Sequence, residues 1–405
     1  MRPVPNQYER YRSIFKNRHM PFAFIDLDNF DRNVEYVAST QRNTGKRIRV
    51  HSKSIRCVEL IKRIINKGGP QFKGVMTFTM EETAFLAANG LDDFIVAYPT
   101  VQPSDMEIFA DLTRRKKKIS LMIDSIDHLR VLSQAGKKAG LTLNACLEID
   151  TAYKPMGLPL YLGVRRSPVR TVEDALRIAR ISLDLPNVRI NAIMGYEAHV
   201  AGPNDNLPGK RGLNRLIRFL KNRSISEFTV RRKSITERLA SEGISLDIVN
   251  GGGSGSLVST GRDPSVTEVT SGSAFYAPGL FWHYRDVDFI PSAFFGIQIV
   301  RKPAKDMVTC QGGGYVASGP AGKDKQPVPV YPEGLCLLPH EGAGEVQTPL
   351  KISEDCPELN LGDPVFFQHA KAGEICERFN FFYLVQGGNI VKKVNTYRGD
   401  GRVFL

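Results

Sequence analysis

The chain has 405 residues, 42% of them hydrophobic and 24% charged, so it is long enough for two domains and has an ordinary globular composition. No run of about 18 or more apolar residues is present and the first residues lack the apolar core of a secretory signal, so we expect a cytoplasmic protein with no membrane partner. The net charge of +13 would suit a nucleic-acid-binding protein. However, its basic clusters at residues 114–118 and 231–233 adjoin helix-like segments without an aromatic platform, so we interpret them as solvated helix ends and expect no nucleic acid.

Short apolar strands alternate with helix-like stretches along the first two thirds of the chain. A strand pattern at residues 22–28 leads into a helix-like stretch at 29–40. Eight further strands follow, at residues 47–53, 74–79, 93–98, 119–124, 144–150, 190–196, 246–250 and 267–270. Eight such repeats over about 250 residues are typical of a TIM-type (β/α)8 barrel. A doubly wound sheet is less favoured because the first turn lacks a dinucleotide fingerprint.

The alternation stops near Trp282. Beyond it the chain is rich in Gly and Pro, and it has β-prone runs at residues 294–300, 307–310, 364–368 and 381–385. We therefore predict an α/β fold with a barrel domain over residues 22–285 and a second, mostly β domain over 286–405. Residues 1–21 are expected to associate with the second domain.

Lys53 ends the first barrel strand, in the segment Arg49-Val50-His51-Ser52-Lys53-Ser54. Barrels keep their chemistry at the carboxyl ends of their strands. A desolvated lysine amine loses its proton more readily and can form a Schiff base. The strand alone fits a surface lysine better than a Schiff-base lysine, so the role of Lys53 has to be decided from the rest of the chain.

Two glycine- and serine-rich loops follow the last two barrel strands. The first contains Gly251 to Ser256 and the second Gly272 and Ser273. Residues without a Cβ let backbone N–H groups approach a phosphate, and barrels often bind phosphate after strands seven and eight. These strands adjoin the first strand in a closed barrel. A lysine beside a phosphate site suits pyridoxal phosphate, whereas a sugar phosphate would leave Lys53 without a special role.

These segments resemble the fold-type III pyridoxal phosphate enzymes, whose barrel is that of alanine racemase, and most closely the branch of D-threonine aldolases and D-serine dehydratases. The resemblance is carried by residues 49–54, 74–82, 92–99, 148–150, 196–199 and the Gly251 loop. It implies a catalytic Lys53 that holds the cofactor as a Schiff base and moves the proton at Cα. It also implies cofactor binding by Arg49, Tyr196, His199, Gly252, Gly253, Ser254, Gly255, Gly272 and Ser273.

The segments around His199 and His369 depart from the family pattern. Relatives have Tyr-x-Gly-His along the cofactor ring, where this chain has Ala198, and a catalytic His199 competes with a buried structural histidine. Aldolases and dehydratases also share a metal site, a histidine followed two residues later by Cys or Asp. Here Lys371 stands at that spacing, so we expect a divalent ion (Zn, Mn or Mg) on His369 with Glu374 or Cys376. The alternative is that Lys371 replaces the ion.

The resemblance also implies a homodimer in which the β domain of one subunit closes the site of the other. Tyr315, in the glycine-rich stretch 311–320, would then be a catalytic proton donor or acceptor, although turns of a β domain explain the same residues.

The resemblance implies a pyridoxal phosphate-dependent lyase whose substrates are small D-3-hydroxy amino acids. Retro-aldol cleavage, as in D-threonine aldolase, is favoured because the His-x-Cys spacing of dehydratases is missing. A D-serine or D-threonine dehydratase, an amino acid racemase and a non-catalytic pyridoxal phosphate carrier are the alternatives, in that order.

Overall fold

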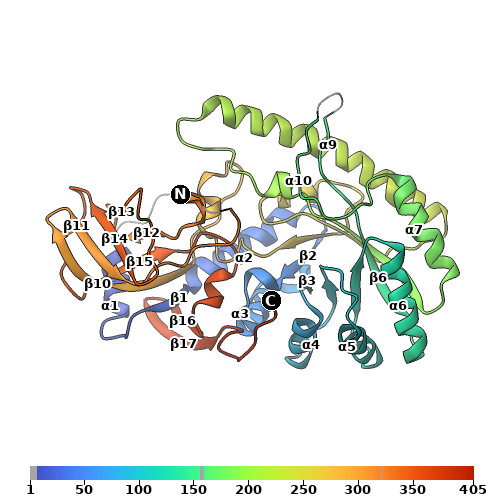
Figure 1. The fold of residues 1–405 in the computed structure, drawn as a ribbon, viewed down its shortest axis with the longest axis horizontal. Helices are drawn as coiled ribbons and strands as arrows, with labels where there is room; N and C mark the ends of the chain where they lie inside the picture. The colour runs from blue at the N-terminus through green and yellow to red at the C-terminus, as the bar shows by residue number, and fades with distance from the viewer. Residues whose placement is uncertain (1–6, 156–158, 321) are drawn as a thin grey trace.

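The computed structural model describes residues 7–155, 159–320 and 322–405. Figure 1 shows a barrel at one end of the molecule and a β-sheet domain at the other, with the long helix α9 (Arg211–Ser241) running across the top of the barrel. No helix among the described residues is both long and apolar enough to traverse a lipid bilayer.

The barrel consists of eight parallel strands in sequence order. They are β2 (Arg47–His51), β3 (Phe72–Thr77), β4 (Phe94–Val96), β5 (Ile119–Ile123), β6 (Leu143–Glu148), β7 (Val188–Gly195), β8 (Ile248–Gly251) and β9 (Glu268–Ser271). The barrel closes because β2 pairs with both β3 and β9, with Val50 opposite Ser271. The predicted (β/α)8 barrel is therefore confirmed.

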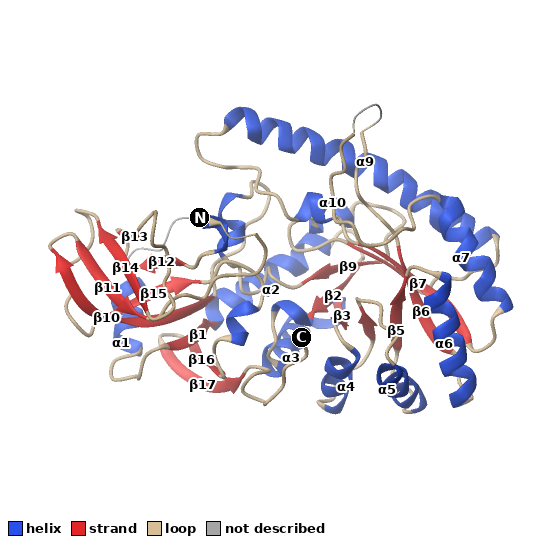
Figure 2. Cartoon of the chain, viewed as in Figure 1, coloured by secondary structure: helices blue, strands red, loops and turns tan. Residues whose placement is uncertain are grey.

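Helices surround the barrel, as Figure 2 shows. Several begin at hydroxyl caps, since Thr79, Ser125 and Thr171 each accept the N–H three residues further on. The remaining helices of this domain are α2 (Leu27–Gln41), α3 (Val58–Gly68), α4 (Met80–Ala88), α5 (Pro103–Arg114), α6 (Ile126–Ala139), α7 (Val172–Asp184) and the short α8 (Ala198–Ala201) and α10 (Leu257–Gly261).

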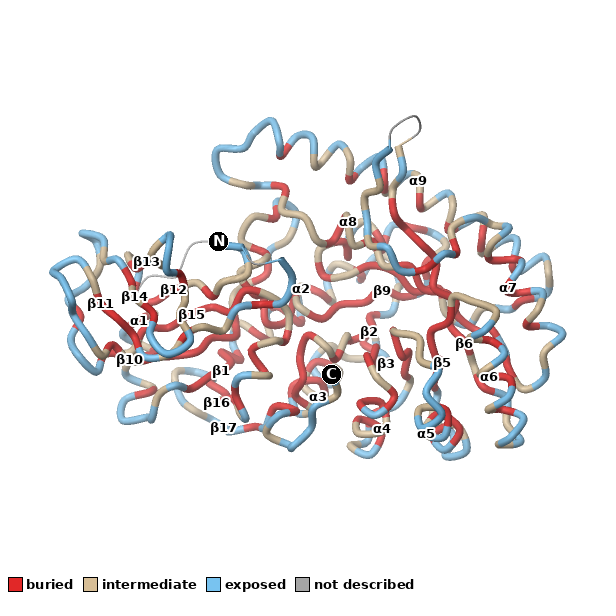
Figure 3. The backbone as a smooth tube through the Cα atoms, in the orientation of Figure 1, coloured by how far each residue is buried: buried red, intermediate tan, exposed pale blue. Residues whose placement is uncertain are grey.

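The barrel interior is filled, so chemistry is confined to its mouth. A central layer consists of the buried side chains Met76, Ile95, Met122, Cys146, Ala192 and Met194. Burial follows the barrel strands and the central strands of the sheet domain, whereas the outer helix faces are exposed (Figure 3). This layer forms a plug in the barrel. Lys53 and the glycine loops lie above it, at the carboxyl ends of the strands.

The second domain is mostly β, as predicted. Its nine strands are β1 (Phe22–Asp26), β10 (Ala293–Ala304), β11 (Met307–Gln311), β12 (Val328–Tyr331), β13 (Leu335–Leu337), β14 (Gln347–Ile352), β15 (Pro364–Gln368), β16 (Phe381–Gln386) and β17 (Asn389–Asn395).

Strand β1 lies in the second sheet, between β10 and β16, whereas the sequence analysis began the barrel at residue 22. All five of its residues are buried, so its pattern resembles that of a barrel strand. Helix α1 (Gln7–Ile14) also packs there, with the Tyr11 ring 4.8 Å from that of Phe24 and 5.7 Å from that of Phe366.

Candidate active site

Lys53 lies where strand β2 passes into a single 3₁₀ turn, Ser52–Ser54. The Lys53 Nζ donates a hydrogen bond to the Tyr98 hydroxyl at 2.9 Å. Behind the turn, the Arg56 Nε donates to the Lys53 carbonyl at 2.9 Å, and Arg56 has a φ of 45°. A non-glycine residue in the left-handed region costs about 1–2 kcal/mol, so its surroundings must hold it. These contacts fix the backbone that presents Lys53.

Two tyrosines and an arginine line the barrel mouth beside Lys53. The Arg166 guanidinium carbon lies 5.8 Å from the centre of the Tyr98 ring and 5.7 Å from that of the Tyr196 ring. The part of the chain that the structure describes offers Arg166 no ion-pair partner. The mouth therefore combines aromatic walls with a cation that no carboxylate among the described residues holds within ion-pair distance. Tyr196, which the sequence predicted to contact the cofactor, is one of these two tyrosines.

The floor of the mouth holds two buried titratable groups. The His51 Nδ1 lies 3.0 Å from the Met76 carbonyl, and burial with the neighbouring Lys53 charge lowers the pKa of His51 to about 3. His51 is therefore neutral at physiological pH. Burial raises the pKa of Glu148 to about 7, although Arg166 acts in the opposite direction. Negative charge at the mouth is thus limited.

The glycine loops after β8 and β9 meet as predicted. The Ser254 Oγ accepts hydrogen bonds from the N–H groups of Gly272 at 3.2 Å and Ala274 at 3.0 Å, which joins the two loops. Within the described residues, the backbone N–H groups of Ser254, Gly255 and Ser273 donate to no acceptor. Unpaired N–H groups on adjoining loops are the donors that a phosphate site requires, and we refer to these three as the anion cup.

Close contacts explain why these positions are glycine. A Cβ on Gly253 would lie 2.8 Å from the Tyr196 ring, and one on Gly272 would lie 2.9 Å from the Ser54 Oγ. The second contact shows that the β9 loop touches the Lys53 turn. Gly252 also belongs to the loop, but its N–H donates to the Glu197 carboxylate and is not available to a ligand.

The residues at the mouth fit pyridoxal phosphate. The free N–H groups of the cup provide a place for the phosphate, and Lys53 provides an amine on the adjoining turn. The rings of Tyr98 and Tyr196 and the guanidinium of Arg166 border the space above the barrel plug. This donor set matches the anion, the aldehyde and the aromatic ring of the cofactor.

Arg49 lies at the other end of the barrel. Its guanidinium bonds to Glu268 at 2.6 Å and to the Asp93 carboxylate at 2.8 Å, and Arg49 is 1% exposed. Glu268 begins β9 and Asp93 precedes β4, so both partners mark the amino ends of the strands. Arg49 therefore belongs to a buried ion-pair cluster, and the predicted contact with the cofactor does not agree with its position.

The His199 side chain contacts helix α9. Its Nε2 bonds to the Ser224 hydroxyl, its ring lies 6.3 Å from that of Phe228, and its Nδ1 has no partner among the described residues. Burial lowers its pKa to about 4. It lines a cavity of about 370 Å³ with Tyr161 and other residues. This position fits the alternative of a structural histidine rather than a catalytic or cofactor-binding one.

A second cavity, of about 460 Å³, extends from Lys53 toward the β domain. Tyr315 lines it, with its ring packed 4.9 Å from that of Phe295 and 5.3 Å from that of Phe379. Burial raises the pKa of Tyr315, so the phenol is protonated at neutral pH. Lys53 and Tyr315 therefore face one cavity within a single chain.

The three predicted metal ligands do not converge. The His369 Nε2 lies 2.7 Å from the Ala372 carbonyl, the Cys376 thiol donates to the Ile55 carbonyl at 3.2 Å, and Glu374 accepts the Ser318 N–H at 3.0 Å. No group of three metal-binding side chains occurs in the described ranges. Each of the three side chains thus has another partner, and the structure does not bring them together at one point. Lys371 lines the Lys53 cavity.

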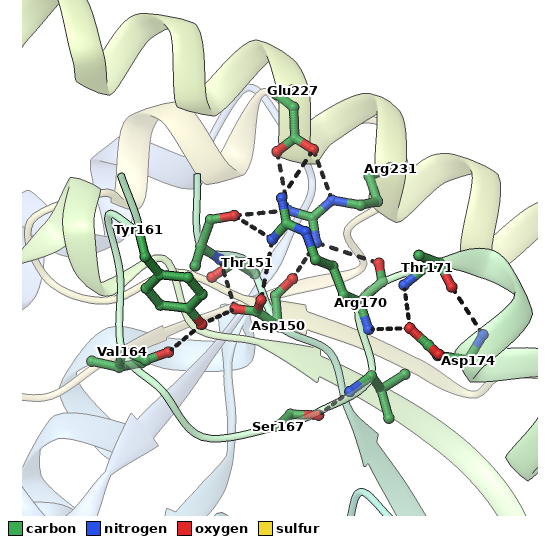
Figure 4. A network of polar contacts seen from close by, with 12 residues as sticks. Asp150, Thr151, Tyr161, Val164, Ser167, Arg170, Thr171, Asp174, Glu227 and Arg231 are labelled. Atoms are coloured by element: carbon green, nitrogen blue, oxygen red, sulfur yellow. Dashed lines mark hydrogen bonds and ion pairs between the residues drawn. The ribbon is translucent and has the colours of Figure 1, made fainter. Parts of the chain in front are cut away.

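Sequence reasoning missed Arg166, which belongs to the irregular segment between β6 and α7. Figure 4 shows how this segment is tied to α9. Arg231 donates to the Asp150 carbonyl and to Glu227, and Arg170 bonds to the Asp150 carboxylate at 3.1 Å. The basic cluster at residues 231–233 was expected to be a solvated helix end. Arg231 instead joins α9 to the segment that follows β6. No local pattern could have revealed this.

Glu82, another residue that the sequence did not single out, lies buried behind the Lys53 turn. It accepts hydrogen bonds from the Phe78 N–H and from the Tyr397 hydroxyl, both at 2.8 Å. Tyr397 in turn donates its N–H to the Arg56 carbonyl. Burial raises the pKa of Glu82 to about 7, against the opposing effect of its hydrogen bonds. Tyr397 of the C-terminal segment thus contacts both the buried Glu82 carboxyl and the backbone of Arg56.

The stability of the protein is expected to depend on Glu82 between about pH 4.5 and 7. Folding raises the pKa of Glu82 from 4.5 to about 7. The contribution of Glu82 to the free energy of unfolding is therefore fully present below about pH 4.5 and lost above about pH 7. The loss is up to about 3 kcal/mol. Urea unfolding of Glu82→Gln should show a smaller pH slope than wild type. The exposed neighbour Glu81, as Glu81→Gln, is the control and should keep the wild-type slope.

Comparisons with known proteins agree with this geometry. The 3-hydroxy-D-aspartate aldolase of Paracoccus denitrificans (strain Pd 1222) is 24% identical over 268 residues, 66% of this chain and 63% of that protein. The D-threonine aldolase of Arthrobacter sp is 24% identical over 297 residues, 72% of this chain and 71% of that protein. The chain therefore matches less than two thirds of the length of the first of these relatives.

Solved structures share the fold over most of the chain. The D-threonine aldolase from Filomicrobium marinum has a TM-score of 0.77 at 19% identity, covering 94% of this chain and 95% of that one. The D-threo-3-hydroxyaspartate dehydratase from Delftia sp. HT23 has a TM-score of 0.72 at 18% identity, covering 94% and 98%. Residues 25–278 match the family described as alanine racemase, N-terminal domain. The chain belongs to this family, whose barrel is that of the fold-type III pyridoxal phosphate enzymes.

Proposed function

We propose that the protein is a pyridoxal phosphate-dependent lyase that cleaves D-3-hydroxy amino acids by a retro-aldol reaction. The observation that carries the proposal is the contact between the Lys53 turn and the anion cup of Ser254, Gly255 and Ser273. The similarity to proteins named 3-hydroxy-D-aspartate aldolase and D-threonine aldolase supports the reaction and the substrate class.

Different residues of the barrel mouth would bind the phosphate, the aldehyde and the ring of the cofactor. Pyridoxal phosphate, when bound, supplies an electron sink for the negative charge that develops at the Cα of an amino acid. The cup would bind its phosphate, and the Lys53 amine would attach to its aldehyde. Tyr98 accepts a hydrogen bond from Lys53 and so orients the amine. Arg166, which lies over the Tyr196 ring, would contact the pyridine ring of the cofactor.

The cavity between Lys53 and Tyr315 would hold the substrate. The Lys53 amine would be the base that takes the β-hydroxyl proton, and loss of this proton would start cleavage between Cα and Cβ. Tyr315, whose pKa is raised by burial, lines the same cavity and would be the proton donor. The pair would thus supply a base and an acid without help from a metal ion on His369, Glu374 or Cys376.

A D-3-hydroxy amino acid dehydratase is the second candidate, favoured by the similar fold of the Delftia dehydratase. In that reaction Lys53 would take the Cα proton and the hydroxyl would leave. A homodimer and a cytoplasmic location remain part of the proposal on the strength of the family resemblance.

Product analysis tests the proposal. Protein loaded with pyridoxal phosphate and given D-threonine or D-serine is expected to release glycine, with acetaldehyde from D-threonine. A keto acid with ammonia would identify a dehydratase, the L-enantiomer alone a racemase, and cofactor binding without turnover a carrier. A chelator should leave the rate unchanged, because the predicted metal ligands have other partners. Loss of activity that added zinc or manganese restores would contradict this.

A further inference from the structure

The turn that carries Lys53 is held from behind by the C-terminal segment that follows β15. The Arg56 Nε donates to the Lys53 carbonyl at 2.9 Å, and the Arg56 guanidinium forms an ion pair with Glu377. The Ile55 carbonyl accepts a hydrogen bond from the Cys376 thiol at 3.2 Å. The second domain therefore contacts the backbone around Lys53, not only the cavity in front of it.

Gly373 packs directly against the peptide group that joins Lys53 to Ser54. A Cβ on Gly373 would lie 2.7 Å from the Lys53 carbonyl oxygen and 2.8 Å from the Ser54 carbonyl carbon. Both are backbone atoms, so no rotation of a side chain could make room. Gly373 has a φ of −93°, which any residue adopts, so the backbone conformation does not require glycine here. The requirement comes from the close approach of the Lys53 turn.

The loop before Gly373 is held in place by hydrogen bonds. The His369 Nε2 lies 2.7 Å from the Ala372 carbonyl, and the His369 carbonyl accepts the Gly279 N–H at 3.0 Å. Ala372 has a φ of 46°, a conformation that costs a residue with a Cβ about 1–2 kcal/mol and that its surroundings must hold. A methyl group added at Gly373 is therefore expected to displace the Lys53 turn rather than this loop.

We propose that Gly373 and Glu377 are positioning residues that set the place of the Lys53 amine at the barrel mouth. This rests on the proposed function, in which Lys53 holds the cofactor. Gly373 leaves room for the turn, and Glu377 holds Arg56, which bonds to the Lys53 carbonyl. A displaced turn would change the hydrogen bond between the Lys53 amine and Tyr98. Displacement of a reacting group by about 1 Å can lower a rate about a hundredfold.

Chemical labelling of the cofactor-free protein tests the positioning without any catalytic reaction. Acetic anhydride acylates free lysine amines, and mass spectrometry of the digested protein gives the rate at Lys53 relative to the other lysines. Gly373→Ala is expected to change this relative rate at least about threefold, because the amine changes its contact with Tyr98. The control is Gly212→Ala on α9. Gly212 is exposed with no atom within 4 Å of its Cβ position, so this variant should keep the wild-type rate.

Kinetics of the holoenzyme provides a second measurement. Gly373→Ala should lower kcat about 10- to 100-fold and change KM less than about threefold, because the amine moves while the side chains that line the cavity stay. Glu377→Gln breaks the ion pair with Arg56 and should lower kcat about three- to tenfold. Glu59→Gln is its control. It removes the exposed ion pair with Lys392, which joins the same two domains away from the turn, and should keep the wild-type kcat.

An unchanged labelling rate at Lys53 in a folded Gly373→Ala protein would overturn the proposal whatever its kcat. If Gly373→Ala does not fold, Glu377→Gln decides, and wild-type labelling in that variant would overturn the proposal. A wild-type protein that binds no pyridoxal phosphate would refute the proposed function instead. The labelling result does not depend on the cofactor and would still decide whether Gly373 and Glu377 position Lys53.

Discussion

Replacement of Lys53 by alanine is expected to abolish attachment of pyridoxal phosphate and to lower turnover by at least about a thousandfold. The Lys53 Nζ donates to the Tyr98 hydroxyl, and the turn that carries Lys53 adjoins the β9 glycine loop. The fold should survive, because the Lys53 side chain is only half-buried and its one hydrogen bond is to Tyr98. The wild-type protein with cofactor should be yellow, and Lys53→Ala should be colourless, with an unchanged unfolding midpoint.

Lys53→Arg is the matched control for charge. Arginine keeps the positive charge beside Tyr98, but its guanidinium stays protonated and does not form a Schiff base. It is therefore expected to be as inactive and as colourless as Lys53→Ala. A yellow Lys53→Arg protein, or a colourless wild type after cofactor addition, would show that the cofactor is not held at this residue.

The barrel was predictable because its strands are local units. Each is a short apolar run that ends at a turn, and the closure of eight of them follows from their number and spacing. Strand β1 has the same local pattern, since all five of its residues are buried. Its place between β10 and β16 depends on partners more than 250 residues away in the chain. No periodicity within residues 22–26 encodes that pairing.

The site divides in the same way. The contact between the Lys53 turn and the β9 glycine loop follows from barrel closure, because the neighbouring strands β2 and β9 end side by side. Arg49 belongs to the same motif as Lys53, but four residues along a strand separate the amino end of a barrel from its mouth. The direction of His199 depends on Ser224 of a distant helix. Motif spacing does not specify either outcome.

Arg232 is expected to show the largest effect on stability. It lies in the middle of α9, 1% exposed, and pairs with Asp263 at 2.8 Å and with Glu197. Both carboxylates are also buried. Replacement by methionine keeps much of the volume but leaves two buried carboxylates without a positively charged partner. Such changes cost about 3–5 kcal/mol, so chemical unfolding of Arg232→Met should show a loss of this size. Lys233→Met, an exposed neighbour on the same helix, should lose less than about 1 kcal/mol.

The same substitution should weaken cofactor binding, because Glu197 links Arg232 to the glycine loop. Glu197 accepts the Gly252 N–H, and Gly252 precedes the cup residues Ser254 and Gly255. The triple variant Arg232→Met/Glu197→Gln/Asp263→Asn removes all three charges and should recover a large part of the lost stability, since the cost comes from unpaired carboxylates rather than from a missing attraction. If the triple variant is as unstable as Arg232→Met, the arginine acts mainly through packing against Phe228. Recovery of stability without recovery of cofactor affinity would assign the Glu197 carboxylate itself to the support of the cup.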